Sequence, residues 1–272
     1  MLGPVTIRVA DIDRSLRFYQ EILGFRPADG GNGLAALGAG GPPVVLLKHV
    51  AGARAARRSS GLYHFAILVP SRPALGQALR RLGEAEIGIG EADHLVSEAL
   101  YLSDPDGNGI EIYRDRPRSE WKWSNGSIQM ATGPLDLEGL LKEGDGGPSP
   151  SRLFPDGTRI GHVHLQVADV EQAVGFYHGA IGFDLTAALQ GAAFLSAGGY
   201  HHHLGLNSWA SRGAPAAPQG STGIESFVIR VPDAESRAAV AGRLQAAGAG
   251  ARMEDGTLRV RDPWNVEILV IS

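Results

Sequence analysis

The stretch that decides the fold is Val9-Ala10-Asp11-Ile12 with the Phe18-Tyr19 and Gly24-Phe25 pairs that follow it, because the same pattern occurs twice. The second copy reads Val167-Ala168-Asp169-Val170, Phe176-Tyr177 and Gly182-Phe183, at a constant offset of 158 residues. Self-similarity at a fixed offset is typical of a repeated structural unit. We therefore expect at least two copies of one unit in the chain.

Each copy combines a strand signal with a helix signal. An alternating run of apolar and polar residues precedes the aspartate in both copies and predicts a strand. These runs are residues 5–9 and 163–167. Asp11 and Asp169 are predicted N-caps, because a side-chain oxygen there accepts a free backbone N–H of the first helical turn. Gly24 and Gly182 are expected to end the two helices.

Two looser units follow the same plan. Strand-like runs at residues 63–69 and 226–231 each precede a helical stretch, near residues 72–83 and 233–247. Each of these units closes with an Asp-Pro turn and a final strand, beginning at Asp104 and at Asp262. Four strand–helix–strands units are therefore predicted, at about residues 1–50, 60–115, 158–208 and 222–272.

A segment rich in proline and glycine separates the second unit from the third. Residues 116–157 contain one short amphipathic piece, Leu135–Leu141. The segment is predicted to be a linker with a short helix, because domain boundaries fall in such Pro/Gly-rich stretches. An N-terminal domain is then expected at residues 1–115 and a C-terminal domain at residues 158–272.

The composition is that of a globular chain and excludes several classes of function. Of 272 residues, 43% are hydrophobic and 20% are charged, which excludes disorder. The net charge of −4 does not supply the positive field that nucleic-acid binding requires. There is no cysteine, so any metal must be held by His, Asp or Glu, and nine histidines are available. Without a secretory signal or a long apolar stretch, a cytoplasmic protein with no membrane contact is expected.

Metal-binding residue types occupy matching positions in the four units. With the first strands aligned on their final valine, one column contains Pro4, His64, His162 and Ser226, and the last strands place Glu111 and Glu267 in another. In these positions the sequence resembles the vicinal oxygen chelate superfamily over nearly the whole chain. The resemblance implies an α+β fold of four βαβββ modules. These form two vicinal-oxygen-chelate domains with cup-shaped mixed sheets that hold a divalent metal.

Three further stretches resemble the two-domain catechol 2,3-dioxygenase group of this superfamily. They are residues 61–67, 93–111 and 198–207. In those enzymes a strand-borne His-His pair follows a glycine, and the resemblance makes His202 the expected acid/base histidine. A tyrosine ten residues before the ligand glutamate and a histidine further upstream correspond to Tyr101 and His94.

The number of ligands in each cup indicates which modules pair. Pairing in chain order would give two plausible ligands to each cup and complete neither site. If the second and third modules pair, one cup collects His64, Glu111 and His162. Two histidines and one carboxylate are typical of non-haem Fe(II) sites with open positions for substrate and O₂. The other cup, with Pro4, Ser226 and Glu267, is then expected to be free of metal.

Each assignment has a plain structural alternative. A single strand histidine more often makes a structural hydrogen bond than binds a metal, and the run around His202 could be a chance polar run. Tyr101 could pack on the sheet, as most strand tyrosines do. Glu267 is interpreted as a remnant or as a salt-bridged strand residue.

The resemblance predicts an extradiol ring-cleaving dioxygenase that acts on catechol or a substituted catechol or hydroquinone. Its metal is expected to be Fe(II), with Mn(II) or another divalent metal as the alternative, and its partners a small aromatic substrate and O₂. Two other functions remain open: a metal-dependent isomerase, lyase or transferase of the glyoxalase or fosfomycin-resistance type, and a binding protein like the bleomycin-resistance proteins. Members of this superfamily commonly dimerise, so a homo-oligomer is compatible with the resemblance.

Overall fold

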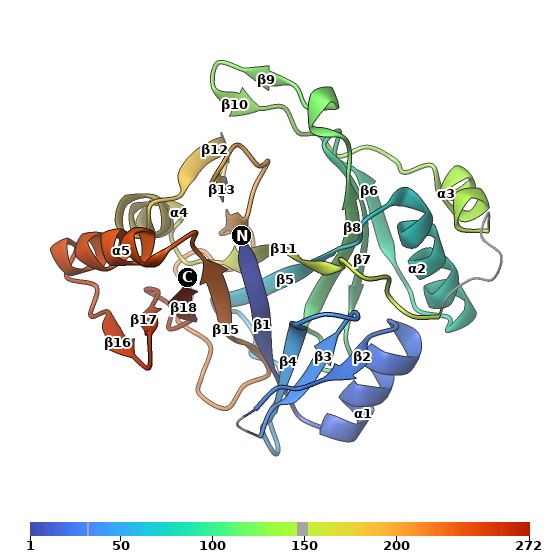
Figure 1. Ribbon diagram of the computed structural model, residues 1–272, viewed down its shortest axis with the longest axis horizontal. Coiled ribbons are helices and arrows are strands. Elements are labelled where there is room, and N and C mark those ends of the chain that lie inside the picture. The colour runs from blue at the N-terminus through green and yellow to red at the C-terminus, as the bar shows by residue number, and fades with distance from the viewer. Residues whose placement is uncertain (32, 146–151) are drawn as a thin grey trace.

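Two eight-stranded sheets organise the computed structural model, which describes residues 1–31, 33–145 and 152–272 (Figure 1). The inner sheet has the order β12 (Asp184–Leu189), β13 (Ala192–Ser196), β14 (Leu204–Asn207), β11 (Arg159–Gln166), β5 (Gly61–Leu68), β8 (Gly109–Asp115), β7 (Ser97–Ser103), β6 (Gly90–Asp93). The outer sheet has the order β16 (Arg252–Glu254), β17 (Thr257–Arg261), β18 (Glu267–Ile271), β15 (Gly223–Arg230), β1 (Leu2–Val9), β4 (Pro43–His49), β3 (Ala35–Gly38), β2 (Arg26–Ala28). The mixed α+β architecture predicted from the sequence is confirmed.

The sheets do not follow the two halves of the chain. The inner sheet joins the second and third units through the antiparallel pair β5–β11, and the outer sheet joins the first and fourth through β1–β15. Each sheet thus takes one unit from residues 1–115 and one from residues 158–272. The boundaries proposed for the two sequence domains and their linker stay predictions. Within the linker lie the hairpin β9 (Trp123–Ser124) and β10 (Ser127–Ile128) and the helix α3 (Leu137–Gly144).

The remaining helices begin and end where local chemistry predicts. Asp11 and Asp169 accept the backbone N–H groups three residues ahead, as expected of N-caps. Gly24 (φ 93°) and Gly182 (φ 102°) adopt the left-handed conformation at the helix ends. The helical segments are α1 (Ile12–Arg17), η1 (Phe18–Ile22), α2 (Arg72–Glu84), η2 (Arg118–Glu120), α4 (Val170–Val174), η3 (Gly175–Ile181) and α5 (Ala234–Ala246). No described helix is long and apolar enough to span a membrane.

Two buried tyrosine–aspartate bonds connect the units across the sheets. Tyr19 of η1 donates to Asp104 (3.0 Å), and Tyr177 of η3 donates to Asp262 (2.9 Å). Each aspartate also accepts backbone N–H groups of its own turn, so the predicted Asp-Pro turns are stabilised by the same carboxylates. Burial raises the pKa of Asp262 from 3.8 to about 6 despite these donors.

Replacing Tyr177 with phenylalanine is expected to destabilise the protein by about 1–3 kcal/mol, because one oxygen of Asp262 loses its buried donor. The pKa of Asp262 is higher in the folded than in the unfolded chain, so its contribution to stability falls as pH rises from about 4 to about 6. The Tyr177 hydroxyl donates to the ionised carboxylate and favours that form. The loss of stability caused by Tyr177→Phe should therefore be larger at about pH 7.5, where Asp262 is ionised, than at about pH 4. Urea unfolding at both values measures this, and equal losses would contradict it.

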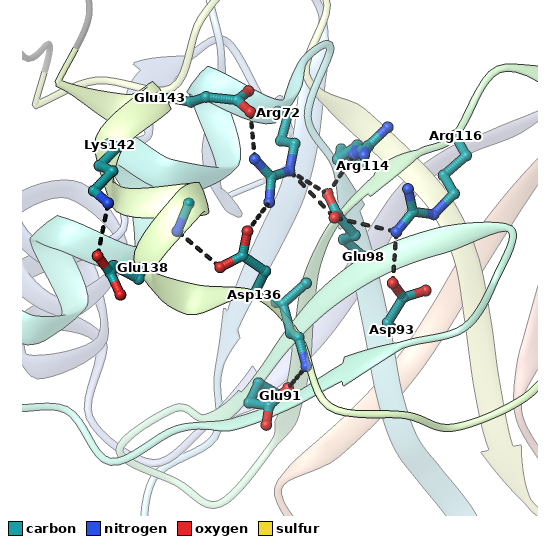
Figure 2. A network of polar contacts seen from close by, with 12 residues as sticks. Arg72, Glu91, Asp93, Glu98, Arg114, Arg116, Asp136, Glu138, Lys142 and Glu143 are labelled. Carbon is teal, nitrogen blue, oxygen red and sulfur yellow. Dashed lines mark hydrogen bonds and ion pairs between the residues drawn. The ribbon is translucent and has the colours of Figure 1, made fainter.

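A polar network fastens helices α2 and α3 to the inner sheet (Figure 2). Glu98 of β7 accepts from Arg72 of α2 (2.9 Å) and from Arg114 (2.6 Å) and Arg116 (3.2 Å) at the end of β8. Arg72 also forms an ion pair with Glu143 of α3. The linker helix is therefore held, through α2, on the side of the sheet that faces away from Tyr101 on β7 and Glu111 on β8.

Candidate metal centre

The register of the inner sheet brings together the three predicted metal ligands. His64 lies on β5 and His162 on β11, with His162 opposite Ala66 across the antiparallel pair. Glu111 lies on β8 and is the parallel partner of the same Ala66. Because alternate residues of a strand share a face, all three side chains project from one face of adjacent strands.

The donor atoms of these three residues converge on one point. The Nε2 atoms of His64 and His162 each lie 2.9 Å from Oε2 of Glu111 and 3.3 Å from each other. Three donors at right angles around a metal, with bonds of about 2.1 Å, would lie about 3.0 Å apart. All three residues are buried, with exposed fractions of 6%, 2% and 2% for His64, His162 and Glu111. The arrangement therefore fits a divalent metal that keeps open coordination positions.

The electrostatics of the cluster favour the protonation states that bind metals. Burial alone would raise the pKa of Glu111, but the two imidazoles that face its carboxylate hold that pKa well below its ordinary value. Burial lowers the pKa of His162, which favours the neutral ring. A carboxylate and a neutral imidazole are the forms that coordinate a metal. Nδ1 of His162 has no hydrogen-bond partner among the described residues.

Tyr101 and His94, both predicted from the resemblance, lie together beside this cluster. Tyr101 is the cross-strand partner of Glu111, and its ring centre is 5.5 Å from that of His64. Nδ1 of His94 lies 2.8 Å from the carbonyl oxygen of Ala131, which can only accept, so Nδ1 carries the proton. Nε2 of a neutral His94 then accepts from the Tyr101 hydroxyl at 2.7 Å. Burial and the charge of Glu111 raise the pKa of Tyr101.

His202 approaches the cluster from the segment between β13 and β14. Its ring centre lies 4.2 Å from that of His162, and the residue lines the same cavity. Burial and the neighbouring imidazoles lower its pKa well below the ordinary value. The structure thus places all six predicted site residues, which are His64, His94, Tyr101, Glu111, His162 and His202, around one cavity of about 630 Å³.

Other residues that line the cavity were not predicted from the sequence. His164 is buried, its ring centre is 4.9 Å from that of His64, and its Nε2 accepts from Asn207 at 3.1 Å. The signal was available, because His162 and His164 alternate on one strand and so share a face. One part of the cavity wall is apolar, and the alternation of residues along the strands did not predict it. It includes Tyr63, Met130, Leu189, Phe194 and Trp209.

The outer sheet corrects one part of the predicted alignment. Glu267 was assigned to the slot of Glu111, but the register pairs Val228, the counterpart of Ala66, with Leu269. The counterpart of Glu111 is therefore Leu269, because the turns after Asp104 and Asp262 have the same length and each of these two residues lies seven positions after its aspartate. Glu267 lies 3.4 Å from Arg259, in agreement with the interpretation as a salt-bridged strand residue.

The same register places the counterpart of Tyr101. Tyr101 pairs with Glu111, and Arg259 pairs with Leu269, so Arg259 occupies the matching position in the outer sheet. Pro4 and Ser226 remain at the positions that correspond to His162 and His64. In the parts of the chain that the structure describes, a group of three potential ligands occurs only in the inner sheet.

Comparison with known proteins identifies the family. The model of the Glyoxalase/Bleomycin resistance protein/Dioxygenase superfamily matches residues 1–112 and 159–270. The chain belongs to this superfamily, as its resemblance to the vicinal oxygen chelate proteins predicted. It is 44% identical over 268 residues to a protein of Bacillus subtilis (strain 168) named catechol-2,3-dioxygenase, an alignment that covers 96% of this chain and 93% of the relative.

Solved structures agree at the level of the fold. A putative dioxygenase from Bacillus subtilis superposes with a TM-score of 0.64 at 16% identity, over 99% of this chain and 84% of that one. Glyoxalase I from Zea mays superposes with a TM-score of 0.59 at 19% identity, over 100% of this chain and 92% of that one.

Proposed function

We propose that this protein is an extradiol ring-cleaving dioxygenase that uses Fe(II), with Mn(II) as the alternative metal, to open catechol or a substituted catechol or hydroquinone. The observation that carries the proposal is the convergence of His64, Glu111 and His162 at 2.9–3.3 Å. The 44% identity to the catechol-2,3-dioxygenase of Bacillus subtilis supports the reaction class. A small aromatic substrate and O₂ are the proposed partners. A cytoplasmic location and a homo-oligomer stay predictions.

The three proposed ligands would hold the metal, and the protein supplies the proton chemistry around it. When bound, a divalent metal supplies a positive centre that favours the anionic form of a catechol and a position for O₂. The Tyr101 hydroxyl donates to His94, so its oxygen can still accept a hydrogen bond from a substrate hydroxyl. Loss of that substrate proton is then favoured by a hydrogen-bonded chain that continues to His94.

His202 is the proposed acid/base group on the other side of the ligands. Its place against His162 puts an imidazole within reach of an oxygen-bearing substrate in the cavity. An imidazole can take up a proton from the substrate and return it when the ring opens. The apolar wall of Phe194 and Trp209 would exclude water from the reacting face.

The test is anaerobic reconstitution with Fe(II), followed by addition of catechol and air. We expect a yellow ring-opened product with one O₂ consumed per catechol, and no product from His162→Ala treated in the same way. The wild-type protein could bind iron without cleaving catechol, while His202→Ala keeps full activity in another metal-dependent reaction. That result would favour an enzyme of the glyoxalase or fosfomycin-resistance type. Failure of the wild-type protein to bind any divalent metal would favour a binding protein of the bleomycin-resistance type.

A further inference from the structure

Behind His202 lies a chain of hydrogen bonds that ends on Asp115. Nδ1 of His202 is 2.8 Å from Nδ1 of His201, and Nε2 of His201 is 2.9 Å from Oδ1 of Asp115. Asp115 is the last residue of β8, on the strand that carries Glu111, whereas the two histidines belong to the third unit. This chain of hydrogen bonds therefore connects the second and third units, as the candidate metal centre does.

The directions of these bonds follow from the chemistry of their ends. A carboxylate only accepts, so Nε2 of His201 must donate to Asp115. A neutral His201 then has a lone pair on Nδ1, and Nδ1 of His202 must donate to it. His202 consequently carries its proton on Nδ1, and Nε2, which has no partner among the described residues, is unprotonated beside the cavity.

The surroundings hold His201 in the orientation that this chain requires. His201 is fully buried, and its ring packs against those of Tyr200 (4.1 Å between centres) and Trp121 (5.2 Å). Tyr200 also donates its hydroxyl to Asp115 at 2.9 Å. Two donors thus fix the carboxylate, and two aromatic rings restrict rotation of the imidazole.

We propose that Asp115 and His201 are positioning residues that hold His202 in its Nδ1–H tautomer and leave Nε2 free to accept a proton. The free side chain of histidine in water prefers the opposite, Nε2–H tautomer, which would present a donor to the cavity instead. The catalytic consequence rests on the proposed function of His202, whereas the tautomer itself is a property of the metal-free protein.

The test is two-dimensional ¹⁵N–¹H correlation of the histidine rings in metal-free protein at about pH 8, where free imidazole is neutral. His202 is assigned with a His202→Gln variant. We expect an unprotonated Nε2 at His202 in the wild type, the reversed tautomer in His201→Leu, and an averaged signal in Asp115→Ala. His201→Asn should keep the wild-type pattern, because its amide oxygen can accept from Nδ1 of His202.

Tyr200→Phe is the matched control, because it removes the other donor to Asp115 without touching the histidine pair. It should keep the wild-type tautomer. A protonated Nε2 in wild-type His202, or an unchanged signal in both His201→Leu and Asp115→Ala, would overturn the proposal.

Activity provides a separate readout. In iron-loaded protein, Asp115→Ala should lower kcat by about 10- to 100-fold at unchanged metal content and KM. If wild-type protein cleaves no catechol, the proposed function fails while the tautomer result still decides on the positioning role.

Discussion

Replacing Glu111 with glutamine is expected to lower the affinity for a divalent metal by more than about 100-fold. Loss of a residue that only orients a metal ligand typically lowers the metal affinity 10- to 100-fold, and Glu111 is itself a proposed ligand. Its carboxylate lies 2.9 Å from both imidazoles and is the one acidic group of the cluster. An amide of the same shape keeps the packing but removes the negative charge that offsets the charge of the metal.

Metal binding can be measured directly, by competition with a coloured chelator and by metal analysis after dialysis. The matched control is Glu267→Gln, since Glu267 is a strand glutamate of the outer sheet that pairs with Arg259. The control should retain wild-type metal content. Wild-type affinity in Glu111→Gln would exclude the proposed centre, whereas equal losses in both variants would point to a general effect on folding.

The second large effect is expected for Glu98→Ala, with a loss of about 3–5 kcal/mol in the free energy of unfolding. The Glu98 side chain is 4% exposed and accepts from three arginines (Figure 2). Removing it would leave three guanidinium groups close together without the carboxylate that they share. Breaking a buried ion pair by removing one partner is costly, because the remaining charges stay desolvated.

An exposed ion pair of the same region provides the control. Glu138 and Lys142 are four residues apart on α3, with side chains 82% and 73% exposed, so Glu138→Ala should cost less than about 0.5 kcal/mol. Urea unfolding of both variants measures the difference. Glu98 and Tyr101 point to opposite faces of β7, so Glu98→Ala is expected to act on stability rather than on metal binding. Similar small losses in both variants would contradict the assigned importance of the network.

Local sequence signals predicted the elements of each unit and their ends. Asp11 and Asp169 cap helices as expected, and the Asp-Pro turns at Asp104 and Asp262 form where their residue types predicted them. Such features depend on hydrogen bonds between residues two to four positions apart, so the sequence contains all the information they need.

The count of potential ligands also predicted which units share a sheet. Only the pairing of the second unit with the third brings His64, Glu111 and His162 together, and β5 and β11 are neighbours in the structure. This inference worked because a metal requires several donors at one point, which is a constraint on tertiary structure that residue types reveal. Their role as ligands stays a proposal.

Only the tertiary structure decided the remaining parts of the site. The position of Glu111 in the outer sheet belongs to Leu269, because the pairing of β18 with β15 sets the register there, and a shift of two residues along a strand keeps the same face. Asp115 and His201 are distant in sequence, and no local pattern links them, yet the β5–β11 pairing places them 2.9 Å apart. The sequence by itself determined the repeated units, their caps and turns, and the residue types available for a metal. Packing of the units against one another determined the register, the cavity wall and the hydrogen-bonded chain behind His202, because these depend on contacts between strands far apart in the chain.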